Sequence, residues 1–150
     1  MVFKREVIMG EFLLVNHTAD VGLQITADSI EDLFVTAAKG WLSLVMPNVD
    51  RQVKQEKPLI IESETLEELL VEFLSELNYL LFVKNWIAKD VKEISIKKMD
   101  GNYSLNSLIV GDIRNSENQP ILLEIKAVTF YDLEIVKVGD QYQTRIIFDT

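Results

Sequence analysis

The sequence predicts an α+β fold in which a mostly antiparallel sheet packs with two amphipathic helices. Two observations carry this prediction: two stretches repeat their apolar residues with the helical period, and most of the remaining chain alternates in short segments separated by turns. A length of 150 residues suits one domain with a substantial core. We expect residues 1–10 to be an N-terminal extension and residues 11–150 to form a single domain.

Two short strands are predicted first. Residues 11–15 form one, and residues 21–26 alternate apolar with polar side chains, as a half-buried strand does. A tight polar connection, residues 16–20, joins them.

A first helix follows and should end before Pro47. Ser29 is a suitable N-cap, with Asp32 three residues later in the manner of a capping box. The apolar residues fall on one helical face: Ile30, Leu33, Phe34, Ala37, Ala38, Trp41, Leu42 and Val45.

A second helix is predicted from a capping box made by Thr65 and Glu68, after a short strand at residues 59–61. It should end near Lys84. One outer face of this helix carries a stripe of glutamates: Glu68, Glu72 and Glu76. The simplest interpretation is a solvated surface, and the alternative is a docking surface for a basic partner.

The remainder predicts strands at residues 91–98, 103–110, 122–130, 132–138 and 142–148. Asp100-Gly101 and Gly139-Asp140 are hairpin signals, because such pairs tolerate the backbone of a two-residue turn. Residues 112–119 form a polar loop.

Composition restricts the function. The net charge is −9, from 24 acidic and 15 basic residues, which argues against direct strong binding of nucleic acid and favours a protein partner with a basic surface. Cysteine is absent, which fits a cytoplasmic protein, and no apolar run is long enough to span a membrane. The glycines form no nucleotide-binding motif, and nothing indicates an independent active site.

Acidic motifs stand near both ends of the chain. The run from His17 to Gly22 (HTADVG) contains Asp20, and Asp149 directly precedes Thr150. The HTADVG run is either a structural turn or a small polar site, and the last residues are either frayed or tied into the sheet. If the fold brings Asp20 beside the C-terminal residues, the converging carboxylates suit a hard cation such as calcium.

Lys126 lies within the run EIKAVTF, residues 124–130. A strand there would place Lys126 on one face with Glu124, Val128 and Phe130. The pattern favours a lysine that snorkels at a sheet edge over a cation aimed at a polar site.

Together, HTADVG, EIKAVTF and the closing IFDT resemble the archease family from about residue 11 to the end. This resemblance implies an archease-like fold and a small accessory protein, not an enzyme, that activates the GTP-dependent RNA ligase of tRNA splicing. It implies that the protein promotes guanylylation of the ligase and its multiple turnover. It also implies a divalent metal, with calcium favoured, on Asp20, Asp149 and Thr150, and a role in partner activation for Lys126. His17 matches the motif histidine, whose role stays open.

Three places in the sequence, four residues in all, depart from the family pattern. Asn16 replaces an acidic residue, Phe130-Tyr131 replaces a Tyr-His pair, and Thr150 replaces an aliphatic residue while keeping backbone or terminal oxygens. Two other functions are weighed beside the ligase activator. One is a general chaperone or specificity factor for RNA-modifying enzymes such as tRNA methyltransferases, and the other is a metal-dependent hydrolase.

Overall fold

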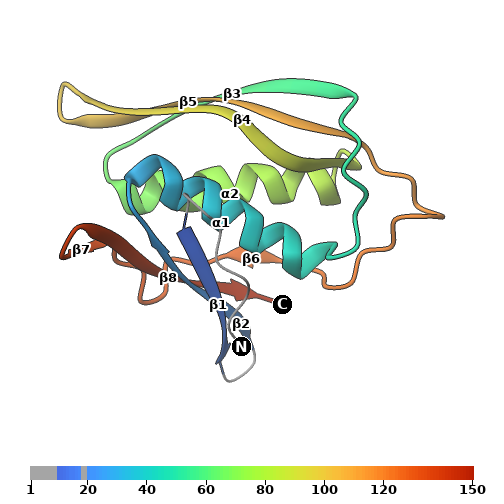
Figure 1. Cartoon of the computed structure of the whole chain (residues 1–150), viewed down its shortest axis with the longest axis horizontal. Helices are drawn as coiled ribbons and strands as arrows, with labels where there is room; N and C mark the ends of the chain where they lie inside the picture. Colours follow the sequence, from blue (N-terminus) through green and yellow to red (C-terminus); the bar gives the residue numbers. More distant parts are fainter. Residues whose placement is uncertain (1–9, 18–19) are drawn as a thin grey trace.

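Two helices lie between two antiparallel sheets in the computed structural model, which describes residues 10–17 and 20–150 (Figure 1). The elements in chain order are β1 (Gly10–His17), β2 (Asp20–Ala27), α1 (Ile30–Val45), β3 (Gln55–Ser63), α2 (Leu66–Phe82), β4 (Trp86–Met99), β5 (Asn102–Ile113), β6 (Ala127–Val128), β7 (Val136–Val138) and β8 (Gln141–Asp149).

The two sheets have different origins in the chain. The first has the strand order β1-β2-β8-β6, with β7 also paired to β8, so it joins the N-terminal hairpin to the C-terminal strand. The second has the order β3-β5-β4 and comes entirely from the middle of the chain. All pairs are antiparallel, which confirms the α+β fold, although the strands divide into two sheets on opposite sides of the helices (Figure 1).

This sandwich explains why α1 is buried on more than the one face that its apolar spacing predicts. Val35, Thr36, Gly40 and Leu44 are buried in addition to most of the predicted face. A helix covered by sheets on two sides has only a narrow solvent-exposed strip, so small or uncharged residues are needed outside the main apolar stripe.

The predicted helix starts are confirmed. The Ser29 side chain accepts a hydrogen bond from the Asp32 N–H at 3.0 Å, and the Thr65 side chain accepts one from the Glu68 N–H at 3.1 Å. Both caps satisfy a backbone donor that the helix itself leaves unpaired. Helix α1 has the predicted bounds, whereas α2 ends at Phe82, before the predicted end near Lys84.

Both hairpin turns are also confirmed. Asp100 and Gly101 have φ values of 53° and 83° and connect β4 to β5, as a type I′ turn requires. Gly139 has a φ of 62° in the turn between β7 and β8.

Two strand predictions were wrong over most of their length. Regular pairing within residues 122–130 is confined to β6, and within residues 132–138 to β7. Away from these short strands, two N–H groups bond to the helical segments instead: the Leu122 N–H donates to the Val45 carbonyl at 2.7 Å, and the Ile135 N–H donates to the Glu67 carboxylate at 2.9 Å. Because the regular strand is confined to β6, the side chains around Lys126 do not alternate between two faces as expected.

Within the described part of the chain, neither helix is long and apolar enough to cross a membrane.

Candidate functional site

Three predicted site positions lie in one row across the β1-β2-β8-β6 sheet, and the row ends beside a fourth, Lys126. His17 pairs with Asp20 at the end of the β1–β2 hairpin where the chain passes from one strand to the other, and Val21 pairs with Phe148. Extending that antiparallel register by one residue sets Asp20 opposite Asp149. On the far side of β8, Asp149 pairs with Ala127, the residue after Lys126. The sheet therefore gathers segments that are more than 100 residues apart in sequence.

Asp20 and Asp149 share one face of this sheet. The core contains Leu23 and Ile25 of β2 and Ile146 and Phe148 of β8, so these side chains face the helices. Because side chains alternate along a strand, the two aspartates project from the opposite face. Directly opposed antiparallel residues have Cα atoms about 4.5–5.5 Å apart, so the two carboxylates are near neighbours.

The C-terminal strand is held in place up to its last residue, which contradicts the alternative of a frayed end at Asp149. The Lys126 N–H donates to the Asp149 carbonyl at 2.8 Å, and the Thr129 N–H and hydroxyl both donate to the Ile147 carbonyl, at 3.0 and 2.9 Å. Asp149 is exposed, while Asp20 and Thr150 are half-buried. The backbone of Asp149 is thus fixed while its carboxylate faces solvent.

The chemistry of these donors fits a hard divalent cation. Asp20 and Asp149 supply carboxylate oxygens, and Thr150 follows directly with further oxygens, the ligand type that calcium prefers. Across residues 10–17 and 20–150, no three Asp, Glu or His side chains cluster as a metal site. The side chain of His17, residues 18–19 and the side chain of Asn16 lie outside what the structure describes. The metal ligands therefore stay a prediction.

Lys126 lies beside the edge strand β6 and is exposed. It lines a cleft of about 500 Å³ between its own segment and the C-terminal half of α2, with Asn78, Tyr79 and Phe82 on the helix side. Tyr79 is 44% exposed, so the cleft offers an aromatic surface next to a cation.

A buried side chain, Asn78, holds the Lys126 segment against the helices. Its amide oxygen accepts a hydrogen bond from the Trp41 indole N–H at 3.0 Å, and its amide nitrogen donates to the Ile125 carbonyl at 2.9 Å. Trp41 is fully buried and Asn78 is 8% exposed. Asn78 thereby connects α1, α2 and the residue before Lys126.

Sequence reasoning did not identify Asn78, although a signal was present. Asn78 lies one turn from both Leu74 and Leu81 on the apolar face of α2. A polar amide on a buried helical face needs partners, since leaving it unpaired costs free energy.

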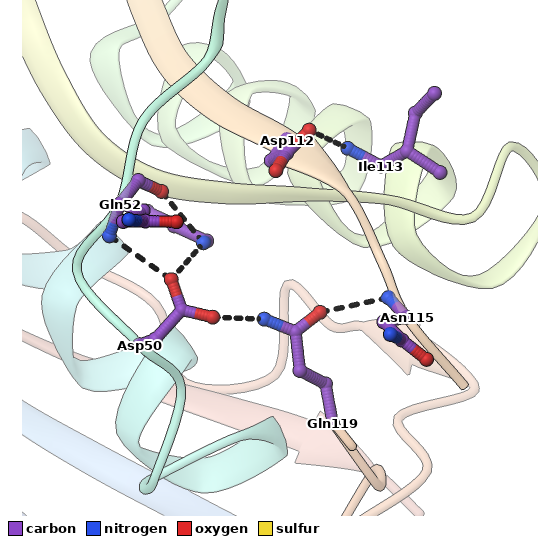
Figure 2. A network of polar contacts seen from close by, with 7 residues as sticks. Asp50, Gln52, Asp112, Ile113, Asn115 and Gln119 are labelled. Atoms are coloured by element: carbon purple, nitrogen blue, oxygen red, sulfur yellow. Dashed lines mark hydrogen bonds and ion pairs between the residues drawn. The ribbon is translucent and has the colours of Figure 1, made fainter. Parts of the chain in front are cut away.

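A second polar network, also missed, joins the loop after α1 to the loop after β5 (Figure 2). One Asp50 oxygen accepts a hydrogen bond from the Lys89 ammonium at 2.8 Å, and the other accepts one from the Gln119 amide at 2.7 Å. The Gln119 side-chain oxygen accepts from the Asn115 N–H at 2.8 Å. The polar loop predicted at residues 112–119 is therefore anchored, and Gln119 is buried.

The Asp50–Lys89 pair is asymmetric. The Lys89 side chain is 2% exposed, whereas that of Asp50 is 56% exposed. The hydrogen bond from Lys89 lowers the pKa of the Asp50 carboxyl below its usual 3.8, with the Gln52 N–H contributing in the same direction. The ionised carboxylate is thus the form that the folded protein favours.

The chain is similar in sequence to proteins of one known family. The sequence model of the archease protein family matches residues 12–150. Protein archease of Methanosarcina barkeri is 29% identical over 139 residues, covering 93% of this chain and 95% of the relative. Protein archease of Thermococcus kodakarensis is 34% identical over 125 residues, covering 83% and 87%.

Two solved structures share the fold. The solution structure of Methanobacterium thermoautotrophicum protein 1598 superimposes with a TM-score of 0.78 at 25% identity, covering 93% of this chain and 98% of the other. The crystal structure of a Thermotoga maritima archease, described as a possible chaperone, gives a TM-score of 0.61 at 25% identity, covering 91% and 94%.

Replacing Asn78 by Leu should destabilise the protein by about 2–4 kcal/mol, because the Trp41 N–H and the Ile125 carbonyl both lose their buried partner. Urea unfolding measures this cost, with the exposed Asn106→Ala as control. In the Asn78→Leu background, Trp41→Phe should cost less than it does alone, since the indole donor is already unpaired. A cost below about 0.5 kcal/mol for Asn78→Leu would contradict the role of this side chain.

Replacing Asp50 by Asn should change how stability depends on pH. Because the folded state lowers the pKa of Asp50, its ionised form stabilises the protein above about pH 4, and this contribution is lost as the pH falls through the lowered value. The difference in unfolding free energy between wild type and variant should therefore be constant from about pH 7 to 5 and shrink at lower pH. Asp140→Asn, in an exposed turn, controls for loss of one charge. A difference that grows on acidification would disprove the assignment.

Proposed function

The chain belongs to the archease family, and from this premise we propose that it is an accessory protein that activates the GTP-dependent RNA ligase of tRNA splicing. In this proposal the protein promotes guanylylation of the ligase and its multiple turnover, without catalysis of its own. The observation that supports it is the row of positions His17, Asp20, Asp149 and Ala127, which brings three separate family motifs to one end of one sheet.

The proposed site has two parts with opposite charge. Asp20, Asp149 and Thr150 would hold a divalent cation, with calcium favoured by their oxygen donors. Lys126 would contact the ligase, and its backbone N–H already bonds to the Asp149 carbonyl at 2.8 Å. Anything that fixes Asp149 therefore also fixes the backbone of Lys126.

The charge of the whole chain supports a protein partner. At −9, the molecule should be repelled by RNA at long range and attracted to the basic surface of an RNA-binding enzyme. The cleft beside Lys126 adds apolar contact area from α2, including Tyr79 and Phe82, which suits a protein interface.

A second candidate function is a general chaperone or specificity factor for RNA-modifying enzymes such as tRNA methyltransferases. The description of the Thermotoga maritima relative as a possible chaperone favours it. The same acidic surface would serve either kind of partner, so the two functions differ in which enzyme is bound.

Multiple-turnover joining of broken tRNA by the host ligase, with substoichiometric amounts of this protein, tests the proposal. Wild type should raise product well beyond one per ligase molecule. Asp20→Asn, Asp149→Asn and Lys126→Gln should each lower this stimulation on the order of 10-fold, the effect of losing one charge-assisted contact. Asp140→Asn and Lys137→Gln, in the exposed β7–β8 hairpin, are the matched controls.

The outcomes separate the two functions. No stimulation of a ligase verified as active, together with binding to a methyltransferase, would replace the ligase activator with the specificity factor. Stimulation that survives all three site substitutions would retain the ligase as partner and reject this site. Nucleotide turnover by the protein alone would instead support a hydrolase.

Calorimetric titration with calcium tests the cation separately. Wild type should bind one calcium ion, and Asp149→Asn should weaken binding by at least about 10-fold because it removes one of few anionic ligands. Glu117→Gln, in an exposed loop, is the control. An equal affinity in Asp149→Asn would reject the assigned ligands, whatever the ligase assay shows.

A further inference from the structure

The outer face of the β3-β5-β4 sheet has no layer above it. The two helices lie against its inner face, and Figure 1 shows no described helix or strand on the other side. Leu59 and Ile61 of β3 and Ile96 of β4 pack against the core, so the residues next to them point outward. The sheet therefore offers a face that another protein can cover.

Ile60 is an apolar projection on this face. It lies on β3 and its side chain is 69% exposed. An isoleucine in water gives up the free energy that burial would supply. Single exposed apolar residues are nevertheless common, so the surroundings of Ile60 decide whether it has a use.

A shallow depression lies on the same face, beyond β5 from Ile60. It has a volume of about 320 Å³, and its lining includes Pro58, Ser95, Asn106 and Leu108. Asn106 of β5 pairs with Ile60 on one side and with Ser95 of β4 on the other. The projection and part of the depression therefore occupy one row across the sheet.

A neighbouring row carries opposite charges in the matching arrangement. Ser104 of β5 pairs with Glu62 of β3 and with Lys97 of β4. Both charged side chains are exposed, and neither has an ion-pair partner within the described part of the chain. Because this row is two residues from that of Ile60 and Ser95, all four side chains share the outer face. The β3 side thus carries a projection and an acid, and the β4 side a depression and a base.

We propose that this face binds a second copy of the chain about a two-fold axis parallel to β5. Such an axis sets β3 of each copy over β4 of the other and keeps the rows in step. Ile60 of one copy then enters the depression beside Ser95 of the other, and Glu62 meets Lys97, with each contact made twice. An axis across the strands would instead set β3 over β3 and the acids Glu56 and Glu62 over one another. Two sheets packed face to face lie about 10 Å apart, which facing side chains can span.

The size of the face predicts weak association. The three strands pair over the nine residues of β3, an area of roughly 31 Å by 14 Å at the usual strand rise and spacing. Two copies would bury roughly 900 Å² counted as flat surface, which is below the size of stable, specific complexes. We therefore expect a reversible dimer with a dissociation constant on the order of 100 μM.

The row of Asp20 and Asp149 stays accessible in this dimer. Both residues belong to the β1-β2-β8-β6 sheet, on the opposite side of the helices (Figure 1). The proposal therefore goes beyond the ligase function and does not depend on it.

Sedimentation equilibrium of the full chain, from about 10 μM to about 1 mM, tests the proposal. Wild type should change from monomer to dimer over this range. Glu62→Lys and Lys97→Glu should each weaken association at least about 10-fold, because either homodimer opposes like charges twice. An equal mixture of the two variants should associate about as well as wild type, because both contacts in their heterodimer again join opposite charges.

Ile60→Ser should also weaken the dimer at least about 10-fold, because it removes the projection that fills the depression. Leu122→Ser is the control, since Leu122 is 73% exposed and lies outside this sheet. An equal effect of these two substitutions would overturn the proposal, as would single charge variants that associate like wild type. A mixture of Glu62→Lys and Lys97→Glu that associates no better than its components would also overturn it. A wild type that stays monomeric at about 1 mM would reject self-association and leave this face to an unlike protein.

Discussion

The buried amide of Asn78 is the interaction on which the rest of the site depends. It bonds to Trp41 on one helix and to the Ile125 carbonyl in the segment that leads into β6, while its own backbone belongs to the other helix. Between two sheets there is little water to satisfy these groups, so the three segments must meet in one arrangement. Because Ile125 directly precedes Lys126, this arrangement also sets where the exposed lysine emerges from the core.

Strand β8 then assembles the site from the two ends of the chain. It is bound by β2 on one side and by β6 and β7 on the other, so Asp149 is placed between Asp20 and the Lys126 segment (Figure 1). These contacts join residues far apart in the sequence, so forming them costs loop-closure entropy. The row that contains Asp20 and Asp149 consequently cannot form until the last residues of the chain have paired.

A second polar contact holds the loops at the end of α1. Asp50 accepts hydrogen bonds from the buried Lys89 ammonium of β4 and from the Gln119 amide in the loop after β5. The contact between Asp50 and Gln119 therefore ties the loop after α1 to the loop after β5 (Figure 2). A buried ammonium is costly unless a carboxylate compensates its charge, so this pair fixes how the two loops meet.

The sequence by itself determined the features that depend on neighbouring residues: the caps at Ser29 and Thr65, the bounds of α1, and the turn at Asp100-Gly101. Each arises from a side chain or backbone that acts within a few residues. The motifs that resemble the archease family also predicted the site positions. Only the tertiary structure decided that the strands form two sheets, that Leu122 and Ile125 bond to helical residues, and that the register sets Asp20 opposite Asp149. It likewise decided that the Lys89 side chain is buried and paired with Asp50. The reason is physical: strand register, bulges and buried hydrogen bonds are settled between segments far apart in the chain, where local patterns carry no information about partners.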